Sequence, residues 1–183
     1  MERKVAGDFD QELLDLYDHY AHGLIERRVF LDRAAKFAVG GLSAATLLET
    51  LSPNYALASQ VDEDDTRIKA ERISYSSPQG HGTVDGYLVR PAGGGKRGSV
   101  VVIHENRGLN PYIADVARRV AVAGFTALAP DGLTPLGGYP GTDDEGKAMQ
   151  KSLDQAKLLE DFIAAFDHLK AAANSNGTNG AGG

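Results

Sequence analysis

The sequence contains no cysteine among its 183 residues. This absence excludes disulfide bonds, thiolate metal sites and a cysteine nucleophile within the chain. No apolar run reaches the roughly 18 residues that suggest a membrane-spanning helix, so we expect no span. The net charge is −6 and the basic residues form no long run, which argues against a nucleic acid partner. Hydrophobic residues still make up 42% of the chain, enough for a packed core.

The first part of the chain has the pattern of an amphipathic helix. Within residues 9–24, apolar side chains recur at three- and four-residue spacing with acids between them. We expect this helix to dock onto the main domain or onto a partner.

Residues 25–58 combine a pair of basic residues with an uncharged stretch and a small-x-small triplet. Arg27 and Arg28 come shortly before Phe-Leu, residues 37–48 are uncharged and apolar or small, and residues 56–58 read Ala-Leu-Ala. This order resembles a twin-arginine export signal with a cleavage site. Such a signal would place the protein in the periplasm.

The same residues have a second interpretation. Glu26 and Asp32 stand where the export motif has a hydroxyl residue and a lysine, and the lead-in is long and acidic. The alternative is a helical N-terminal arm that packs on the main domain of a cytoplasmic protein. Residues 1–58 are therefore predicted to be either a helical extension or an export signal.

Composition divides the rest of the chain into three segments. Residues 59–67 are acidic and polar, and are predicted to be a linker. Residues 68–173 alternate strand and helix patterns and form the predicted main domain. Residues 174–183 are rich in Gly and Asn, which predicts a disordered tail.

The main domain has the element order of an α/β protein. Two alternating strands form a predicted hairpin, and a continuous apolar strand, a helix, a second apolar strand, a long loop and another amphipathic helix follow. This order predicts a parallel sheet with flanking helices, right-handed crossovers and an N-terminal β-hairpin. The two hairpin strands are expected at 70–77 and 84–91, and the two apolar strands at 99–105 and 125–131. The helix between the apolar strands is expected at 110–124, the long loop at 132–146 and the last helix at 151–173.

Polar residues gather where the two apolar strands end. His104 and Glu105 directly follow one strand, and Asp131 ends the other. Ligands of open α/β sheets bind beyond the carboxyl ends of the strands. We expect these two strands to be neighbours, so that their loops line one cleft.

The same strand ends carry a family resemblance. The stretch His-Glu-Asn-Arg-Gly-Leu-Asn at 104–110 and the Ala-Pro-Asp at 129–131 resemble the N-terminal half of the dienelactone hydrolase family, a branch of the α/β-hydrolases. The resemblance covers about residues 68–176. It implies a partial α/β-hydrolase fold that hydrolyses a small-molecule ester or lactone by a nucleophile-His-acid mechanism, without a cofactor.

The resemblance also assigns roles to two neighbouring residues. It implies that Glu105 is a carboxylate in the network around the nucleophile, and that the backbone N–H of Asn106 forms half of an oxyanion hole. A rigid backbone donor ahead of a helix can stabilise developing negative charge. A structural alternative for Glu105 is to cap the next helix or to pair with Arg107.

Each of the remaining candidate residues has a functional and a structural interpretation of similar weight. Arg107 could clamp a substrate carboxylate or be a solvated loop residue. Tyr139 could border the cleft or anchor its loop, and Asp131 is expected to cap the turn after its strand. We interpret His104 as a packing or hydrogen-bonding group rather than a catalytic base, and the other histidines as surface or structural, and we predict no metal site. The loop Gly93-Gly94-Gly95-Lys96 lacks the spacing of a phosphate-binding loop.

The chain has no G-x-[Ser/Cys]-x-G motif, which carries the nucleophile in α/β-hydrolases. Gly41-Leu42-Ser43-Ala44-Ala45 is a near-match, but no strand leads into it. We therefore expect a chain that is truncated before its nucleophile and inactive by itself. Half a sheet would expose a strand edge that favours self-association. The alternative function is a non-catalytic binding or structural protein that docks through its N-terminal helix and this edge.

Overall fold

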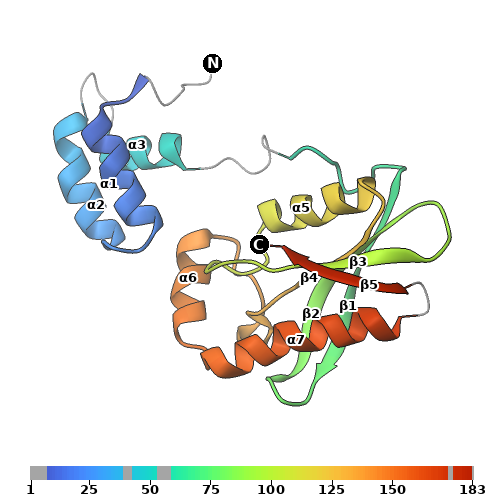
Figure 1. Cartoon of the computed structure of the whole chain (residues 1–183). Coiled ribbons are helices and arrows are strands. Elements are labelled where there is room, and N and C mark those ends of the chain that lie inside the picture. The colour runs from blue at the N-terminus through green and yellow to red at the C-terminus, as the bar shows by residue number, and fades with distance from the viewer. Residues whose placement is uncertain (1–7, 39–42, 53–58, 173–174, 183) are drawn as a thin grey trace. The chain divides into compact units, whose positions relative to one another are not determined.

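The computed structural model describes residues 8–38, 43–52, 59–172 and 175–182. The chain divides into two compact units, residues 1–54 and 55–183, each with its own internal packing. We describe the two units separately (Figure 1).

The described part of the first unit is helical. Asp10 caps α1 (Gln11–Ala21) by accepting a hydrogen bond from the Glu12 N–H, and this helix is the one that the apolar spacing predicts. The unit continues with α2 (Arg27–Ala34), the short 3₁₀ helix η2 (Ala35–Phe37) and α3 (Ala44–Leu51).

The first unit has a small hydrophobic core of its own. Phe30 is fully buried, and the rings of Tyr17 and Tyr20 pack against it at centroid distances of 6.3 and 5.4 Å. Arg27 and Arg28 lie at the start of α2, while the Ala-Leu-Ala triplet at 56–58 falls outside the described residues. The buried members of this core are Leu13, Leu16, Phe30, Ala34, Leu47 and Leu48.

The second unit is built on a five-stranded sheet in the order β1-β2-β4-β3-β5. β1 and β2 form an antiparallel hairpin, and β2 pairs antiparallel with β4. β3 lies between β4 and β5 and is parallel to both. The predicted α/β class with an N-terminal hairpin is confirmed. The strand bounds are β1 (Ile68–Ser77), β2 (Gly82–Pro91), β3 (Arg97–Val102), β4 (Thr126–Pro130) and β5 (Ser175–Gly182).

Two helices cover opposite faces of the sheet (Figure 1). Adjacent strand residues point to opposite faces, so Val102 packs under α5 (Pro111–Val122) while Val101 packs under α7 (Gln155–Ala171). The sequence predicts both helices. Asn110 caps α5 by accepting a hydrogen bond from the Ile113 N–H at 3.0 Å, with Pro111 in the first turn.

The predicted long loop 132–146 is only partly a loop. It contains the 3₁₀ helix η3 (Thr134–Leu136), and its last residues begin α6 (Asp143–Lys151). Thr142 caps the start of that helix: its hydroxyl accepts from the Glu145 N–H and donates to the Glu145 carboxylate. The sequence prediction overlooked this signal.

The predicted helix 151–173 begins later than expected. Lys151 ends α6, and α7 starts at Gln155 after a turn. Asp154 sets this start, because its carboxylate accepts hydrogen bonds from the N–H groups of Ala156 and Lys157.

The segment predicted as a linker is anchored to α5. Val61 is buried, and Asp115 on α5 accepts hydrogen bonds from the N–H groups of Gln60 and Val61, both at 3.0 Å. Arg118 donates to the Val61 carbonyl at 2.6 Å. The acidic composition of the segment does not indicate this contact. Its partners on α5 lie 54 to 57 positions away in the sequence, beyond the reach of any local pattern.

The predicted disordered tail is wrong for residues 175–182, which form β5. This strand pairs in parallel with β3, with Ser99 opposite Asn179 and Val102 opposite Gly182. Sheet pairing uses backbone groups, so a Gly- and Asn-rich segment can occupy an open strand edge despite its low β-propensity. β5 therefore covers the edge of β3 that we expected to be exposed, and becomes the outer strand.

None of the helices in the described ranges is long and apolar enough to cross a membrane.

Candidate active site

The candidate site lies at the carboxyl ends of β3 and β4. The two strands are parallel neighbours, with Val101 opposite Leu128, so the residues that follow them meet at one end of the sheet. The backbone N–H of Gly132 donates a hydrogen bond to Nε2 of His104 at 3.0 Å. The predicted adjacency of the two strand ends is correct.

His104 is a buried packing residue at this junction. It is 2% exposed, and its ring meets Phe162 of α7 edge-on at a centroid distance of 5.4 Å. Burial lowers the pKa of His104 and outweighs the opposing effects of Asp131 and the Glu105 backbone. The imidazole is therefore neutral near pH 7 and accepts a hydrogen bond through Nε2.

Glu105 and Asn106 follow His104 on the loop toward α5. The side chain of Glu105 is exposed, and its backbone carbonyl accepts a hydrogen bond from Gln150 Nε2 at 2.6 Å. Asn106 is half-buried, and its backbone N–H has no hydrogen-bond partner among the described residues. The Asn106 N–H is thus a backbone donor that the described residues leave uncommitted at the end of the sheet.

Arg107 and Tyr139 are brought together by a residue that the sequence prediction missed. Asp143, the first residue of α6, accepts hydrogen bonds from Arg107 Nη1 at 3.0 Å, from Tyr139 Oη at 2.9 Å and from Asn110 Nδ2 at 3.2 Å. Arg107 is therefore ion-paired rather than solvated, and Tyr139 anchors its loop. The only sequence signal for Asp143 was its place in the first turn after the Thr142 cap.

α6 also approaches the loop closely through a glycine. A Cβ added at Gly146 would lie 2.2 Å from the Arg107 carbonyl oxygen, so a larger residue would push the helix away. Gly146 and Asp143 together hold the loop that carries Asn106 against α6.

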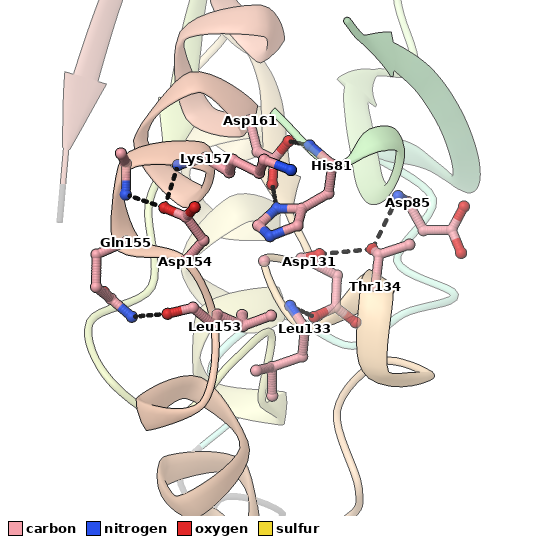
Figure 2. Close-up of polar contacts among 12 residues, drawn as sticks. His81, Asp85, Asp131, Leu133, Thr134, Leu153, Asp154, Gln155, Lys157 and Asp161 are labelled. Carbon is pink, nitrogen blue, oxygen red and sulfur yellow. Dashed lines mark hydrogen bonds and ion pairs between the residues drawn. The ribbon is translucent and has the colours of Figure 1, made fainter. Parts of the chain in front are cut away.

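Asp131 organises the second loop of the site. It is buried, and its carboxylate accepts hydrogen bonds from the N–H groups of Leu133 at 3.1 Å and Tyr139 at 3.2 Å. Its backbone carbonyl accepts from the Thr134 hydroxyl at 2.6 Å (Figure 2). The prediction that Asp131 caps the turn after its strand is confirmed.

A carboxylate–imidazole pair lies near this loop (Figure 2). His81, at the turn between β1 and β2, contacts Asp161 Oδ2 through Nδ1 at 2.6 Å and donates its backbone N–H to Asp161 Oδ1 at 2.9 Å. Asp161 is completely buried on α7. The sequence interpretation of His81 as structural agrees with this geometry, but the partner could not be seen from spacing.

Tyr75 extends the pair. Its hydroxyl donates to the Asp161 carbonyl at 2.9 Å. Burial raises the pKa of Tyr75, and the nearby carboxylates of Asp161 and Asp131 raise it further. The phenol therefore stays protonated and acts as a fixed donor.

The near-match to a nucleophile motif has a structural role. Ser43 caps α3 by accepting a hydrogen bond from the Thr46 N–H at 3.1 Å, while Gly41 and Leu42 lie outside the described residues. Among the residues that the structure describes, no group of three or more His, Asp or Glu side chains could hold a metal ion.

Comparisons with known proteins agree with this architecture. The model of the dienelactone hydrolase family matches residues 84–181, and a YqhI-like model matches residues 1–36. YghX of Escherichia coli strain K12, described as a hydrolase fragment, is 61% identical over 114 residues, which are 62% of this chain and 97% of YghX. YqhI of the same strain is 64% identical over 36 residues, which are 20% of this chain and 77% of YqhI.

The solved structures give the same result. A dienelactone hydrolase-like promiscuous phosphotriesterase, P91, from metagenomic libraries superposes with a TM-score of 0.52 at 26% identity, over 63% of this chain and 48% of that one. The chain thus spans about half the length of this structural relative. The parallel strands that meet at His104 and Asp131, together with the family match over 84–181, show that the chain belongs to the dienelactone hydrolase family.

Proposed function

We propose that this chain supplies the oxyanion-hole side of a site that hydrolyses a small ester or lactone. The observation that carries the proposal is the backbone N–H of the half-buried Asn106, which has no partner in the described part of the chain. A tetrahedral intermediate of acyl transfer develops negative charge on oxygen, and a fixed backbone donor stabilises it without reorganisation.

The surroundings of Asn106 support this role because they hold the loop in place. On one side His104 is hydrogen-bonded to Gly132, and on the other Arg107 is ion-paired with Asp143. Gln150 fixes the carbonyl of Glu105, the residue just before Asn106. A donor that is held in this way keeps its direction when substrate binds.

The roles of the neighbouring side chains follow from their contacts. Glu105 keeps the role that the family resemblance implies, in the network around a nucleophile, and its exposed carboxylate is accessible to a group from another segment. A substrate carboxylate would have to compete with Asp143 for Arg107. We therefore assign Arg107 and Tyr139 primarily to positioning the loops, with substrate contact secondary.

We further propose that the 183-residue chain does not turn over substrate by itself. Hydrolysis by this family's mechanism requires a nucleophile, a base and an orienting acid. The sequence contains no cysteine and no G-x-S-x-G motif to supply the nucleophile. The purified chain should therefore hydrolyse p-nitrophenyl butyrate no faster than buffer, and saturable hydrolysis would contradict this part of the proposal.

The oxyanion role can be tested without turnover. Butylphosphonate carries tetrahedral anionic oxygens like those of the intermediate, and we expect it to shift the Asn106 amide resonance in a ¹⁵N NMR titration with saturation. Asn106→Ala is the matched control, because it removes the side chain but keeps the N–H, and should respond equally. An amide that does not respond, or a response that is lost in Asn106→Ala, would refute a backbone oxyanion hole at this position.

For the first unit we propose a folded helical extension rather than an export signal, and we call this extension the arm. Phe30, which follows the arginine pair, is fully buried in a packed helical core, so the motif is not presented as an open segment. The YqhI-like match over residues 1–36 includes the arginine pair within a larger similarity. Intact mass after expression tests this: retention of residues 1–58 supports the arm, and cleavage after Ala58 supports the signal.

A further inference from the structure

A cavity lies at the opposite end of the sheet from the candidate active site. Its volume is about 210 Å³, and it is bordered by the starts of β3 and β4. Three cationic side chains line it, from Lys69, Arg90 and Arg97, together with the backbone of the glycine loop 93–95. No carboxylate lines it, although the chain as a whole has a net charge of −6.

Two of these cations face each other across the hairpin. Lys69 on β1 is directly opposite Arg90 on β2 in the antiparallel register. Like charges at directly opposed positions destabilise a sheet. Arg90 reaches Glu71 at 2.6 Å, whereas Lys69 has no ion-pair partner in the residues that the structure describes. Lys69 thus brings a positive charge that an anion in the cavity would neutralise.

Arg97 provides a fixed charge with an unused donor. Its terminal nitrogens donate to the carbonyls of Gly93 at 3.2 Å, Gly94 at 3.4 Å and Gly124 at 3.5 Å, which hold the guanidinium without neutralising it. Its Nε is buried and has no hydrogen-bond partner in the described ranges. An unpaired buried donor is unfavourable, so the protein's own acceptors leave this guanidinium incompletely satisfied.

The glycine loop allows this approach. Gly95 has a φ of +113°, which disfavours other residues, and a Cβ at Gly93 would already lie 3.4 Å from the Arg97 guanidinium. The loop thus has a backbone conformation that favours glycine at Gly95, and its carbonyls at Gly93 and Gly94 accept hydrogen bonds from the arginine.

We propose that this cavity binds a small phosphate-bearing anion, at a site separate from the candidate active site. Guanidinium groups match the geometry of phosphate oxygens, and a lysine adds a point charge. Recognition rests on side chains from β1, β2 and β3, which explains why the loop lacks the spacing of a phosphate-binding loop at a helix start. The ligand is either inorganic phosphate or the phosphate group of a phosphomonoester.

The test is an NMR titration of the full 183-residue chain at constant ionic strength. Inorganic phosphate and glucose 6-phosphate are the two probes, and sodium chloride replaces them in the reference. We expect saturable shifts of the amides of Gly93, Gly94 and Arg97. Equal affinity for both probes identifies the phosphate group as the whole ligand, and tighter binding of the ester identifies a phosphomonoester.

Variants at an exposed lysine separate this site from general charge effects. Lys69→Gln should weaken phosphate binding by about fivefold, corresponding to one exposed charge. Lys69→Arg keeps the charge and should bind within about twofold of the parent. Lys170→Gln, an exposed lysine on α7, is the matched control and should leave binding unchanged.

Three results would overturn the proposal. They are shifts that do not saturate, an equal loss of affinity in Lys69→Gln and Lys170→Gln, and an unchanged affinity in Lys69→Gln. Lys69→Arg preserves the charge and is the control for folding. If its spectrum and affinity match those of the parent, a loss of affinity in Lys69→Gln is due to the missing charge in the cavity and not to a change in the fold.

Discussion

Nε2 of His104 accepts a hydrogen bond from the backbone N–H of Gly132 at 3.0 Å. This contact joins the residues that follow two neighbouring parallel strands and places a neutral imidazole beneath the candidate site. The acceptor role requires an unprotonated Nε2, so the junction depends on the protonation state of one buried side chain.

The first prediction is a pH dependence of stability that depends on His104. Its pKa is lowered in the folded chain, so protonation favours the unfolded chain, and stability falls as the pH drops from about 6.5 toward the lower folded value. His104→Gln removes this titration. Below pH 6.5, the free energy of unfolding of this variant should therefore change with pH less steeply than that of the parent, by up to about 1.4 kcal/mol per pH unit. Urea unfolding at several pH values measures it. Equal slopes in the parent and the variant would contradict the prediction, and His19→Gln, at an exposed position, is the control.

The second prediction concerns Asp143, which joins Arg107, Tyr139 and Asn110. Asp143→Ala removes three hydrogen bonds and should lower the free energy of unfolding by about 2 kcal/mol. It should also weaken the response of the Asn106 amide to butylphosphonate, because the loop loses its anchor. Asp144→Ala makes the same charge change one residue away, and an equal effect of both variants would refute a specific role for Asp143.

The third prediction is a strong coupling between His81 and Asp161. Asp161 is completely buried, so replacing it leaves His81 without its carboxylate partner. Asp161→Asn should lower the free energy of unfolding by about 2 kcal/mol. A double-mutant cycle with His81→Gln should give a coupling energy of about 2 kcal/mol. Additive effects of the two substitutions would mean that the contact does not stabilise the turn.

The fourth prediction is that Asp115 holds residues 59–61 on α5. Asp115→Ala removes the acceptor of the Gln60 and Val61 N–H groups, and these amides should exchange with solvent about tenfold faster. Hydrogen exchange followed by NMR measures the effect. Asp167→Ala on the exposed face of α7 is the control, and unchanged exchange in Asp115→Ala would show that Arg118 alone anchors the segment.

The sequence predicted elements whose signals are local. Asn110 followed by Pro111 marks the start of α5, and the apolar run before His104 marks a strand that is buried on both faces. Such signals arise from capping and from burial of one helix face or both strand faces, which act over a few residues. The family resemblance also predicted at which end of the sheet the site lies.

The sequence did not reveal contacts between distant segments. Asp161 meets His81 from 80 positions away, and Asp143 meets Arg107 from 36 positions away. Neither pair has a spacing that periodicity could detect, because each depends on how a helix packs against a loop.

By itself, the sequence determined the α/β class and the strand ends that carry the polar residues. It also determined that Asn106 lies in a loop before a helix. Only the tertiary structure decided that this loop is held by Asp143 and that residues 175–182 form a strand on β3. The physical reason is that local propensity acts through neighbouring residues, whereas ion pairs and strand pairing depend on partners that folding brings together.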